Sequence, residues 1–276
     1  MSIDAHQHFW HYDPVRYDWI DDSMTQLQRD FLPDDLGPIL NQHAMQGSVA
    51  VQAHQSLEET QFLLGLAEQH DSILGVVGWT DLKADNLEDQ LQHLNSFEKL
   101  KGFRHILQVE EPEFMLEDRF QEGIAMLSNY DFTYDILIFP HQLKAATELV
   151  SRHPNQAFVL DHLAKPYIKD GKLDQWAGDL WLLAQHPKVY CKLSGLITEA
   201  DRQNWKTEHI YPYLDIALAA FGVDRLMFGS DWPVCQLAGS YHQVVELLDQ
   251  YLDGYPQEDL DKIWGLNAIE FYQLDV

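Results

Sequence analysis

Basic residues are scarce in this sequence, because 18 lysines and arginines stand against 44 aspartates and glutamates, for a formal charge of −26. Such a chain is poorly suited to neutralise the phosphates along a nucleic-acid groove, and an anionic membrane surface would repel it. We therefore expect neither partner. A neutral small-molecule substrate, or an anion held by a local cluster of cations, stays open.

Cysteine is also rare, since the chain has only Cys191 and Cys235. Two cysteines in unrelated contexts indicate no disulfide framework, which is typical of a reduced, cytoplasmic protein. No basic segment followed by an apolar segment precedes the first strand-like run, so we expect no signal peptide. No apolar run approaches the roughly 18 residues that a membrane span needs. The expected location is the cytoplasm.

Short apolar runs alternate with longer amphipathic runs along the whole chain, which has 276 residues and is 46% hydrophobic. The short runs predict strands and the runs at helical spacing predict helices. The predicted strands are 2–6, 47–53, 73–79, 101–106, 132–138, 156–161, 188–193 and 225–229. The predicted helices are 34–45, 57–70, 87–100, 118–129, 141–153, 173–186, 206–221, 240–252 and a closing segment at 256–273.

Eight strands, each followed by a helix, favour a (β/α)8 TIM barrel in a single domain over residues 1–276. A doubly wound open sheet is the competing arrangement. The longest irregular segment, 9–33, follows the first strand, and a loop of that length is usually functional. We interpret it as a lid or pocket wall, or as an aromatic plug over the barrel mouth. Its rings are Phe9, Trp10, Tyr12, Tyr17, Trp19 and Phe31.

Two histidines lie together at the end of the first predicted strand, in the run Asp4-Ala5-His6-Gln7-His8. Chemistry in a barrel of this kind lies at the C-terminal ends of the strands. Side chains alternate along a strand, so His6 and His8 share a face. Two imidazoles on one face can chelate one cation, although each could also be a structural histidine.

The later strands also end in polar side chains, each of which has a structural interpretation when it is taken alone. Arg104 and Lys192 could be salt-bridge partners within the barrel, and Asp161 could cap a loop. Together they predict a polar pocket at the barrel mouth. In chain order these side chains are Gln52, His54, Arg104, His105, Asp161, His162, Lys192 and Asp231.

Several motifs together resemble the amidohydrolase superfamily: Asp-x-His-x-His on the first strand, VLDHLAKP on the sixth, KLSGL on the seventh and FGSDWP on the eighth. The segments VVGWTDL and GFRHILQ narrow the resemblance to the "amidohydrolase 2" branch, which holds sugar-acid lactonases such as fuconolactonase and rhamnonolactonase. The resemblance spans nearly the whole chain. It implies hydrolysis at the mouth of a (β/α)8 barrel, with a divalent metal, zinc being favoured, at His6, His8, His162 and Asp231.

The chain departs from the binuclear members of that superfamily, which use a lysine or carboxylate at the end of strand 4 and a histidine at the end of strand 5. Here Lys101 lies at the beginning of strand 4, and the fifth strand reaches no histidine before His141, beyond Pro140. We therefore expect one metal ion at most. Catalysis without a metal stays open, as is thought for some lactonases of the branch.

The expected reaction is hydrolysis of an aldonolactone to the free acid. Asp231 is the candidate general base and later general acid. Without a metal, Arg104, His162 or Lys192 would stabilise the oxyanion. Polyols bind planar polar groups and ring faces, which predicts substrate contacts at Trp10, Gln52, His54, Gln108, Lys165, Lys192 and Trp232.

Two alternatives to the lactonase are kept. A metal-dependent decarboxylase of an aromatic or unsaturated acid would use the same four ligands, and only the lactonase-like segments weigh against it. A barrel that binds a carbohydrate acid without catalysis would not need the carboxylate of Asp231. The sequence predicts neither the particular lactone nor the oligomeric state.

Overall fold

The computed structural model describes all 276 residues and forms one sheet of eight parallel strands in the order β1 to β8. Residues after β8 connect its end to β1, since the Asp231 N–H donates to the His6 carbonyl at 2.8 Å and the His8 N–H donates to the Trp232 carbonyl at 2.7 Å. The predicted barrel and its eight strands are confirmed. The strands are β1 (Ile3–Gln7), β2 (Gly47–Val51), β3 (Ile73–Gly78), β4 (Leu100–His105), β5 (Thr133–Ile136), β6 (Phe158–Leu160), β7 (Val189–Leu193) and β8 (Leu226–Phe228).

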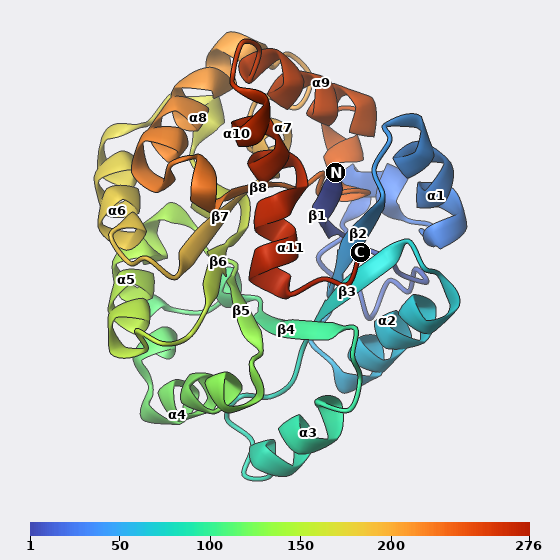
Figure 1. The fold of residues 1–276 in the computed structure, drawn as a ribbon, viewed down its shortest axis with the longest axis vertical. Helices are drawn as coiled ribbons and strands as arrows, with labels where there is room; N and C mark the ends of the chain where they lie inside the picture. Colours follow the sequence, from blue (N-terminus) through green and yellow to red (C-terminus); the bar gives the residue numbers. More distant parts are fainter.

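Helices surround the strands, as Figure 1 shows. None of them combines the length and apolar character that crossing a membrane requires. They are α1 (Pro33–Gln42), α2 (Leu57–Gln69), α3 (Leu87–Leu94), α4 (Asp118–Leu127), α5 (Leu143–Arg152), α6 (Asp174–Ala184), α7 (Leu196–Glu199), α8 (Thr207–Phe221), α9 (Tyr241–Tyr251), α10 (Gln257–Asp261) and α11 (Asn267–Tyr272).

The helices differ from the prediction at three places. The predicted helix 87–100 ends at Leu94, and Leu100 instead begins β4, where it pairs with Val76. The predicted closing segment is divided into α10, a π-helical turn over residues 262–266, and α11. Gly265 in that turn lies against the Met1 backbone, closer than a side chain would allow. Helix α7 was not predicted, because four residues are too few to show a helical period.

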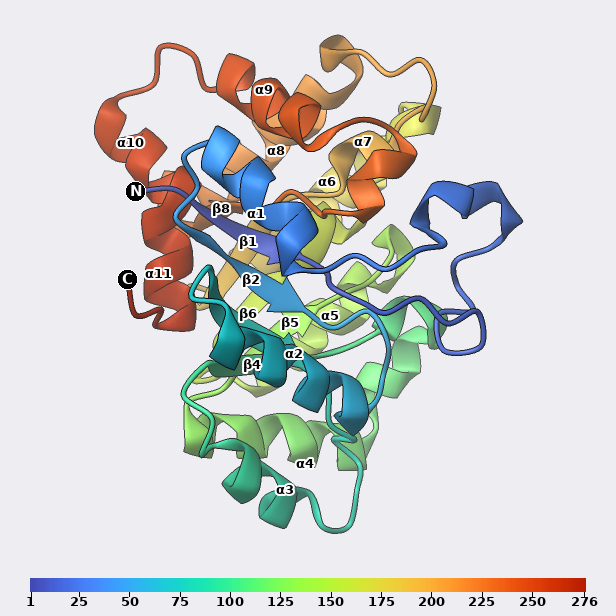
Figure 2. The ribbon, with the colours of Figure 1, turned by 90° about the vertical axis from the view of Figure 1, so that its right-hand side faces the viewer.

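The buried apolar side chains form two clusters. A large cluster fills the space between the strands and the surrounding helices. A smaller one lies inside the barrel, where Val49, Val159 and Met227 pack against Phe271 and Tyr272 of α11. Figure 2 shows α11 and both chain termini at one end of the barrel and the long loop after β1 at the other. Helix α11 therefore closes the apolar end, and the polar strand ends lie at the opposite end.

The loop 9–33 is ordered by hydrogen bonds from its aromatic side chains. Trp10 Nε1 donates to the Arg29 carbonyl at 2.9 Å, and Trp19 Nε1 donates to the Ala53 carbonyl at 3.1 Å. The Tyr17 hydroxyl donates to Glu59 Oε2 of α2 at 3.3 Å. These contacts hold the loop against the segment between β2 and α2, so it forms a wall beside the strand ends.

Candidate active site

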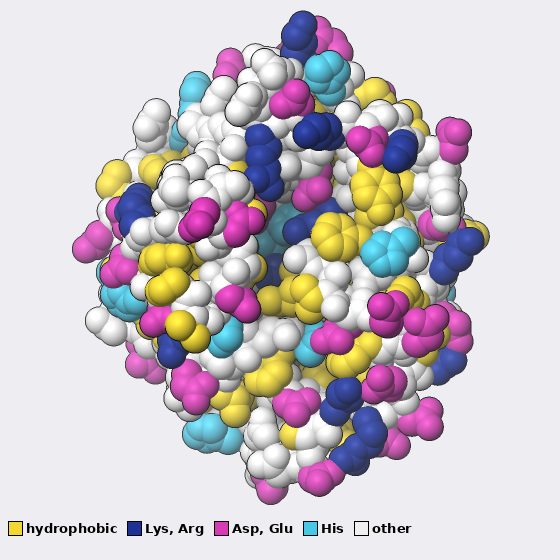
Figure 3. Space-filling model, turned by 180° about the vertical axis from the view of Figure 1, so that it is seen from behind, with side chains coloured by type: hydrophobic (Ala, Val, Ile, Leu, Met, Phe, Trp, Pro, Cys, Tyr) yellow, Lys and Arg dark blue, Asp and Glu magenta, His cyan; other side chains and the backbone are white.

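The mouth of the barrel is a hollow that gathers histidine and charged side chains. Figure 3 shows this face, with histidine, basic and acidic side chains visible within a depression near its centre. His6, His8, His162, Arg104 and Asp231 are each no more than 5% exposed. The structure thus brings together the residues that the sequence predicts as catalytic or metal-binding.

A shift in the strand register lets β1 present both of its histidines. Ala5 packs in the apolar cluster inside the barrel, yet the next residue, His6, also contacts an interior side chain, Lys192. The pairing of β1 with β2 shifts register between Asp4 and Gln7, as at a β-bulge. Bulges re-aim side chains beside active sites. His6 and His8 consequently face each other, with their Nε2 atoms 3.2 Å apart.

One carboxylate oxygen faces all three histidines. Asp231 Oδ1 lies 3.4 Å from His8 Nε2. It lies 3.9 Å from the Nε2 atoms of both His6 and His162. The Nδ1 atom of His162 is 2.8 Å from the Ser194 hydroxyl, which holds the other edge of that ring. The four side chains, which come from β1 and from the residues directly after β1, β6 and β8, form a compact cluster.

The backbone that carries two of these residues is strained. Asp231 has a φ of 57°, and His162 has a φ of 53° and begins a run of four non-glycine residues with positive φ that ends at Lys165. The left-handed region costs roughly 1–2 kcal/mol for each such residue. Gly195 packs against this run, and a Cβ there would lie 2.7 Å from His162 Nδ1. Strain of this kind concentrates at functional sites, where the surrounding structure enforces it.

Burial sets the protonation state of the cluster. It lowers the pKa values of His6 and His8 and lowers the pKa of His162 to about 4. Burial alone would raise the pKa of Asp231, but its interactions with the three histidines outweigh burial and hold this pKa below the ordinary value. At neutral pH the site therefore presents neutral imidazoles and an ionised carboxylate.

The donor set fits a divalent cation. His6, His8 and Asp231 each offer one ligand atom, and these atoms lie within 4.8 Å of one another. His8 Nδ1 is 2.7 Å from the Val51 carbonyl, so it carries the proton and leaves Nε2 with a free lone pair. A hydrogen bond on the far ring nitrogen is the usual way in which a protein orients a histidine ligand.

A second group of possible ligands, His6, Asp161 and His162, fits a cation less well. Asp161 already lies 3.0 Å from Arg104 NH1 and 3.1 Å from Lys192 Nζ. Two fixed positive charges at one carboxylate disfavour a further divalent ion. Lys101, which binds the Gln273 carbonyl at the α11 end of the barrel, lies far along β4 from the mouth.

Arg104 is placed beside the cluster by Gln52. Arg104 NH2 donates to the Gln52 carbonyl, and Gln52 Nε2 donates to the Arg104 carbonyl at 3.0 Å. Arg104 NH1 lies 3.4 Å from His6 Nε2. Arg104 Nε and Gln52 Oε1 are buried without a hydrogen-bond partner. Buried polar groups are normally satisfied, so these two atoms are candidates for ligand contacts.

Three of the predicted substrate contacts, Lys192, Trp10 and Trp232, are buried side chains, and their roles as substrate contacts stay predictions. Lys192 is fully buried beneath His6, and its Nζ pairs with Asp135 at 2.6 Å. It precedes the last residue of β7, and its side chain points into the barrel. The Trp10 ring is fully buried against Phe31 and other rings of its own loop, so it offers no free face to a sugar. The Trp232 ring is also buried, although its Nε1 has no hydrogen-bond partner.

The other predicted contacts lie on the loops that follow the strands. His54 is half-buried, with its ring 6.1 Å from the ring of Tyr17. Gln108 is half-buried, and its Oε1 has no partner. Lys165 ends the left-handed run, and its Nζ lies 5.6 Å from the centre of the Phe139 ring. Their roles as substrate contacts stay predictions.

Three acidic residues support the site, of which sequence reasoning named Asp161 at the barrel mouth without its partners and gave no role to Asp4 or Asp135. Asp161 binds Arg104 and Lys192, and Asp135 binds Lys192. Asp4 accepts hydrogen bonds from the Ser230 hydroxyl at 2.6 Å and the Ser230 N–H at 2.9 Å, next to Asp231. The sequence does contain a sign of these roles, because each carboxylate lies within or directly after a short buried strand, and a buried charge requires partners.

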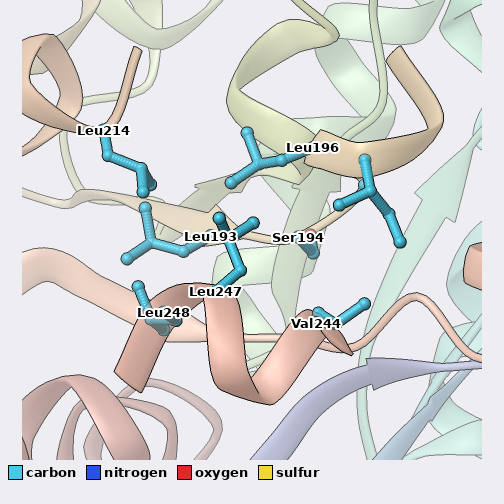
Figure 4. Close-up of a pocket in the computed structure, with 9 residues that line it drawn as sticks. Leu193, Ser194, Leu196, Leu214, Val244, Leu247 and Leu248 are labelled. Atoms are coloured by element: carbon cyan, nitrogen blue, oxygen red, sulfur yellow. The ribbon is translucent and has the colours of Figure 1, made fainter. Parts of the chain in front are cut away.

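A pocket outside the barrel has a different character. Figure 4 shows leucine and valine side chains converging between the end of β7 and helices α8 and α9. Seven of its nine lining residues are hydrophobic, and it contains none of the histidines. We assign it to the packing of helices against β7, apart from the polar mouth.

Comparisons with known proteins agree with this geometry. A family profile described as amidohydrolase matches residues 3–274. An L-fucono-1,5-lactonase from Burkholderia multivorans is 42% identical over 286 residues, covering 99% of this chain and 96% of the relative. One from Burkholderia ambifaria is 35% identical over 280 residues, covering 100% and 96%. A crystal structure of a Burkholderia multivorans amidohydrolase with bound zinc has a TM-score of 0.95 and 42% identity, covering 100% of both chains.

Proposed function

This chain belongs to the amidohydrolase family, and on that premise we propose that it opens a sugar-acid lactone to the free acid, with Asp231 activating the attacking water. The observation that carries the proposal is its 42% identity, over 99% of the chain, with a protein that acts as an L-fucono-1,5-lactonase. The class of substrate is therefore an aldonolactone, and L-fucono-1,5-lactone is the first candidate.

The cluster holds the Asp231 carboxylate in the ionised state that a general base requires. Asp231 is ionised at neutral pH, and all three of its close contacts with the neutral histidines use Oδ1. The second oxygen, Oδ2, would accept a proton from the water that attacks the lactone carbonyl carbon. When the ring C–O bond breaks, the same carboxyl group would return that proton to the leaving alkoxide.

Arg104 is the proposed stabiliser of the oxyanion. Its Nε–H is buried without a partner, while NH1 and NH2 are fixed by Asp161 and Gln52. A fixed donor in a buried site stabilises developing negative charge without having to reorganise. His162, held by Ser194, would orient the Asp231 carboxylate and the bound water through its Nε2 edge.

His6, His8 and Asp231 would hold a divalent cation, for which we propose zinc, with His162 at its edge. A bound cation of this kind would polarise the lactone carbonyl and lower the pKa of a water molecule. Arg104 NH1 lies 3.4 Å from His6 Nε2, so this guanidinium borders the residues that would hold the cation.

Substrate hydroxyls are proposed to bind polar atoms that have no protein partner. Gln52 Oε1 and Gln108 Oε1 are buried acceptors, and Trp232 Nε1 is a buried donor. His54 and Lys165 would add contacts from the rim. Leaving such atoms unpaired costs free energy, so a ligand that satisfies them is favoured.

The test is a substrate panel assayed for pH change and for CO2 release. It contains aldonolactones that include L-fucono-1,5-lactone, N-acyl amino acids, aryl phosphates and aromatic carboxylates. We expect proton release from one or more aldonolactones and little activity on amides or phosphates, since a lactone is an activated ester. Decarboxylation with every lactone inert would replace this proposal by the decarboxylase alternative, and binding without turnover would indicate a non-catalytic barrel.

A further inference from the structure

A line of buried polar contacts connects the closing helix α11 to the histidine cluster. The Tyr272 hydroxyl of α11 donates to Asp135 Oδ2 at 2.8 Å. The same oxygen lies 2.6 Å from Lys192 Nζ, and Lys192 Nζ lies 3.1 Å from His6 Nδ1. All four side chains are at most 1% exposed. The line runs through the barrel, from its apolar end to its mouth.

The charged partners of Lys192 restrict where its ammonium group can lie. Lys192 has two carboxylate partners, Asp135 at 2.6 Å and Asp161 at 3.1 Å. Its Nζ also lies 5.4 Å from the centre of the Tyr272 ring, within cation–π range. A buried ammonium without such partners would be strongly unfavourable. The position of Lys192 is consequently set by Asp135, Asp161 and Tyr272 together.

We propose that Tyr272, Asp135 and Lys192 are positioning residues that hold the Nδ1 edge of His6 and so keep its Nε2 turned toward His8 and Asp231. The Nδ1 edge faces a donor, Lys192, and an acceptor, Asp161 Oδ1 at 3.3 Å. Either placement of the imidazole proton therefore finds a partner without rotation of the ring. A ring that stays fixed keeps Nε2 at 3.2 Å from His8 Nε2.

The Tyr272 hydroxyl is the end of this line and gives the cleanest test. Tyr272→Phe removes one oxygen and keeps the ring that packs inside the barrel. Asp135 would then lose a donor and draw Lys192 toward itself, away from His6. The matched control is Tyr251→Phe, because the Tyr251 hydroxyl also donates to an aspartate, Asp215, at 2.8 Å, but on outer helices.

Three measurements distinguish positioning from mere stability. In metal-free protein, the ring ¹⁵N shifts of His6 should change in Tyr272→Phe and not in Tyr251→Phe. Zn²⁺ affinity, measured by competition with a fluorescent chelator, should fall about 10-fold to 100-fold, as for other groups that orient a ligand. With a lactone substrate, kcat should fall while KM stays unchanged, since Tyr272, Asp135 and Lys192 are buried within the barrel.

The kinetic part rests on the proposed function, whereas the ¹⁵N and Zn²⁺ measurements do not. If no lactone is hydrolysed, those two measurements still decide the positioning role. Asp135→Asn, which keeps the side-chain shape and removes the charge, should change both in the same direction and more strongly. Near-ultraviolet circular dichroism checks that each variant is folded. A folded Tyr272→Phe that matches Tyr251→Phe in His6 shifts and Zn²⁺ affinity would overturn the proposal.

Discussion

Asp231 Oδ1 lies 3.4 Å from His8 Nε2, and this contact joins the residues that follow the first and last strands of the barrel. The contact depends on backbone bonds that run alongside it, from the Asp231 N–H to the His6 carbonyl and from the His8 N–H to the Trp232 carbonyl. The backbone segments that close the barrel therefore also place His6, His8 and Asp231 beside one another. A change that opens the β1–β8 seam should remove the site as well.

Asp231→Asn should abolish turnover in a protein that stays folded. The substitution keeps the shape of the side chain and removes the base, and general base catalysis alone is worth ~10²–10⁴ in rate. Lactone hydrolysis and circular dichroism are measured on the same sample, with Asp253→Asn, an exposed aspartate, as the control. Activity near that of the parent protein in a folded Asp231→Asn would remove this residue from the mechanism.

The chain should bind one divalent ion tightly, and no more. His6, His8 and Asp231 form the favourable group, whereas Asp161 in the second group is already paired with Arg104. Zinc titration followed by metal analysis should give a molar ratio no higher than about one. His8→Ala should lower the ratio sharply, and His242→Ala, an exposed histidine, should leave it unchanged. A ratio near two would show that Asp161 binds metal despite its partners.

The sequence predicted the eight strands and the histidine pair well, because both depend on short-range periodicity. It did not predict that Lys192 lies beneath His6, although the predicted end of the seventh strand, residue 193, agrees with β7. A strand pattern assigns a side chain to a face, and it does not tell how deep in the barrel that side chain lies. The role of Tyr272 had no local signal at all, because its contact with Asp135 joins residues 137 positions apart.

The aromatic loop shows a second limit of pattern reading. Its length indicated a functional wall, and the structure places it beside the strand ends through Tyr17 and Trp19. The sequence could not predict which rings of the loop face inward, because irregular segments have no period that assigns a side chain to a face. Trp10 consequently turned out to be part of the internal packing of the loop.

Gly195→Ala should damage activity more than stability. Gly195 has a φ of 66°, and a Cβ there would lie 2.7 Å from His162 Nδ1. The control is Gly171→Ala, because Gly171 has a φ of 63° and nothing within 4 Å of its would-be Cβ. Both variants should lose roughly 1 kcal/mol in free energy of unfolding from backbone strain. Only Gly195→Ala should lose about 10-fold or more in kcat, since it displaces His162. Equal kcat values for the two variants would mean that the position of His162 is unimportant.

Glu59→Gln should change how stability depends on pH. Burial raises the pKa of Glu59 to about 7, although the N–H groups of Ala53 and His54 donate to its carboxylate and oppose the shift. A carboxyl group whose pKa is raised on folding stabilises the fold while it is protonated. That contribution is largest below the ordinary pKa of glutamate and is lost as pH rises through about 7.

Glutamine at position 59 resembles the protonated acid and does not titrate. Between pH 5 and 7.5 the parent protein should therefore lose on the order of 2 kcal/mol in free energy of unfolding relative to Glu59→Gln. Urea unfolding across that range measures this difference. The control is Glu58→Gln, a change at the exposed neighbouring residue of α2, whose free energy of unfolding should depend on pH as it does in the parent protein. Parallel pH profiles for the parent protein and Glu59→Gln would show that the carboxylate stays ionised throughout and that its backbone donors outweigh burial.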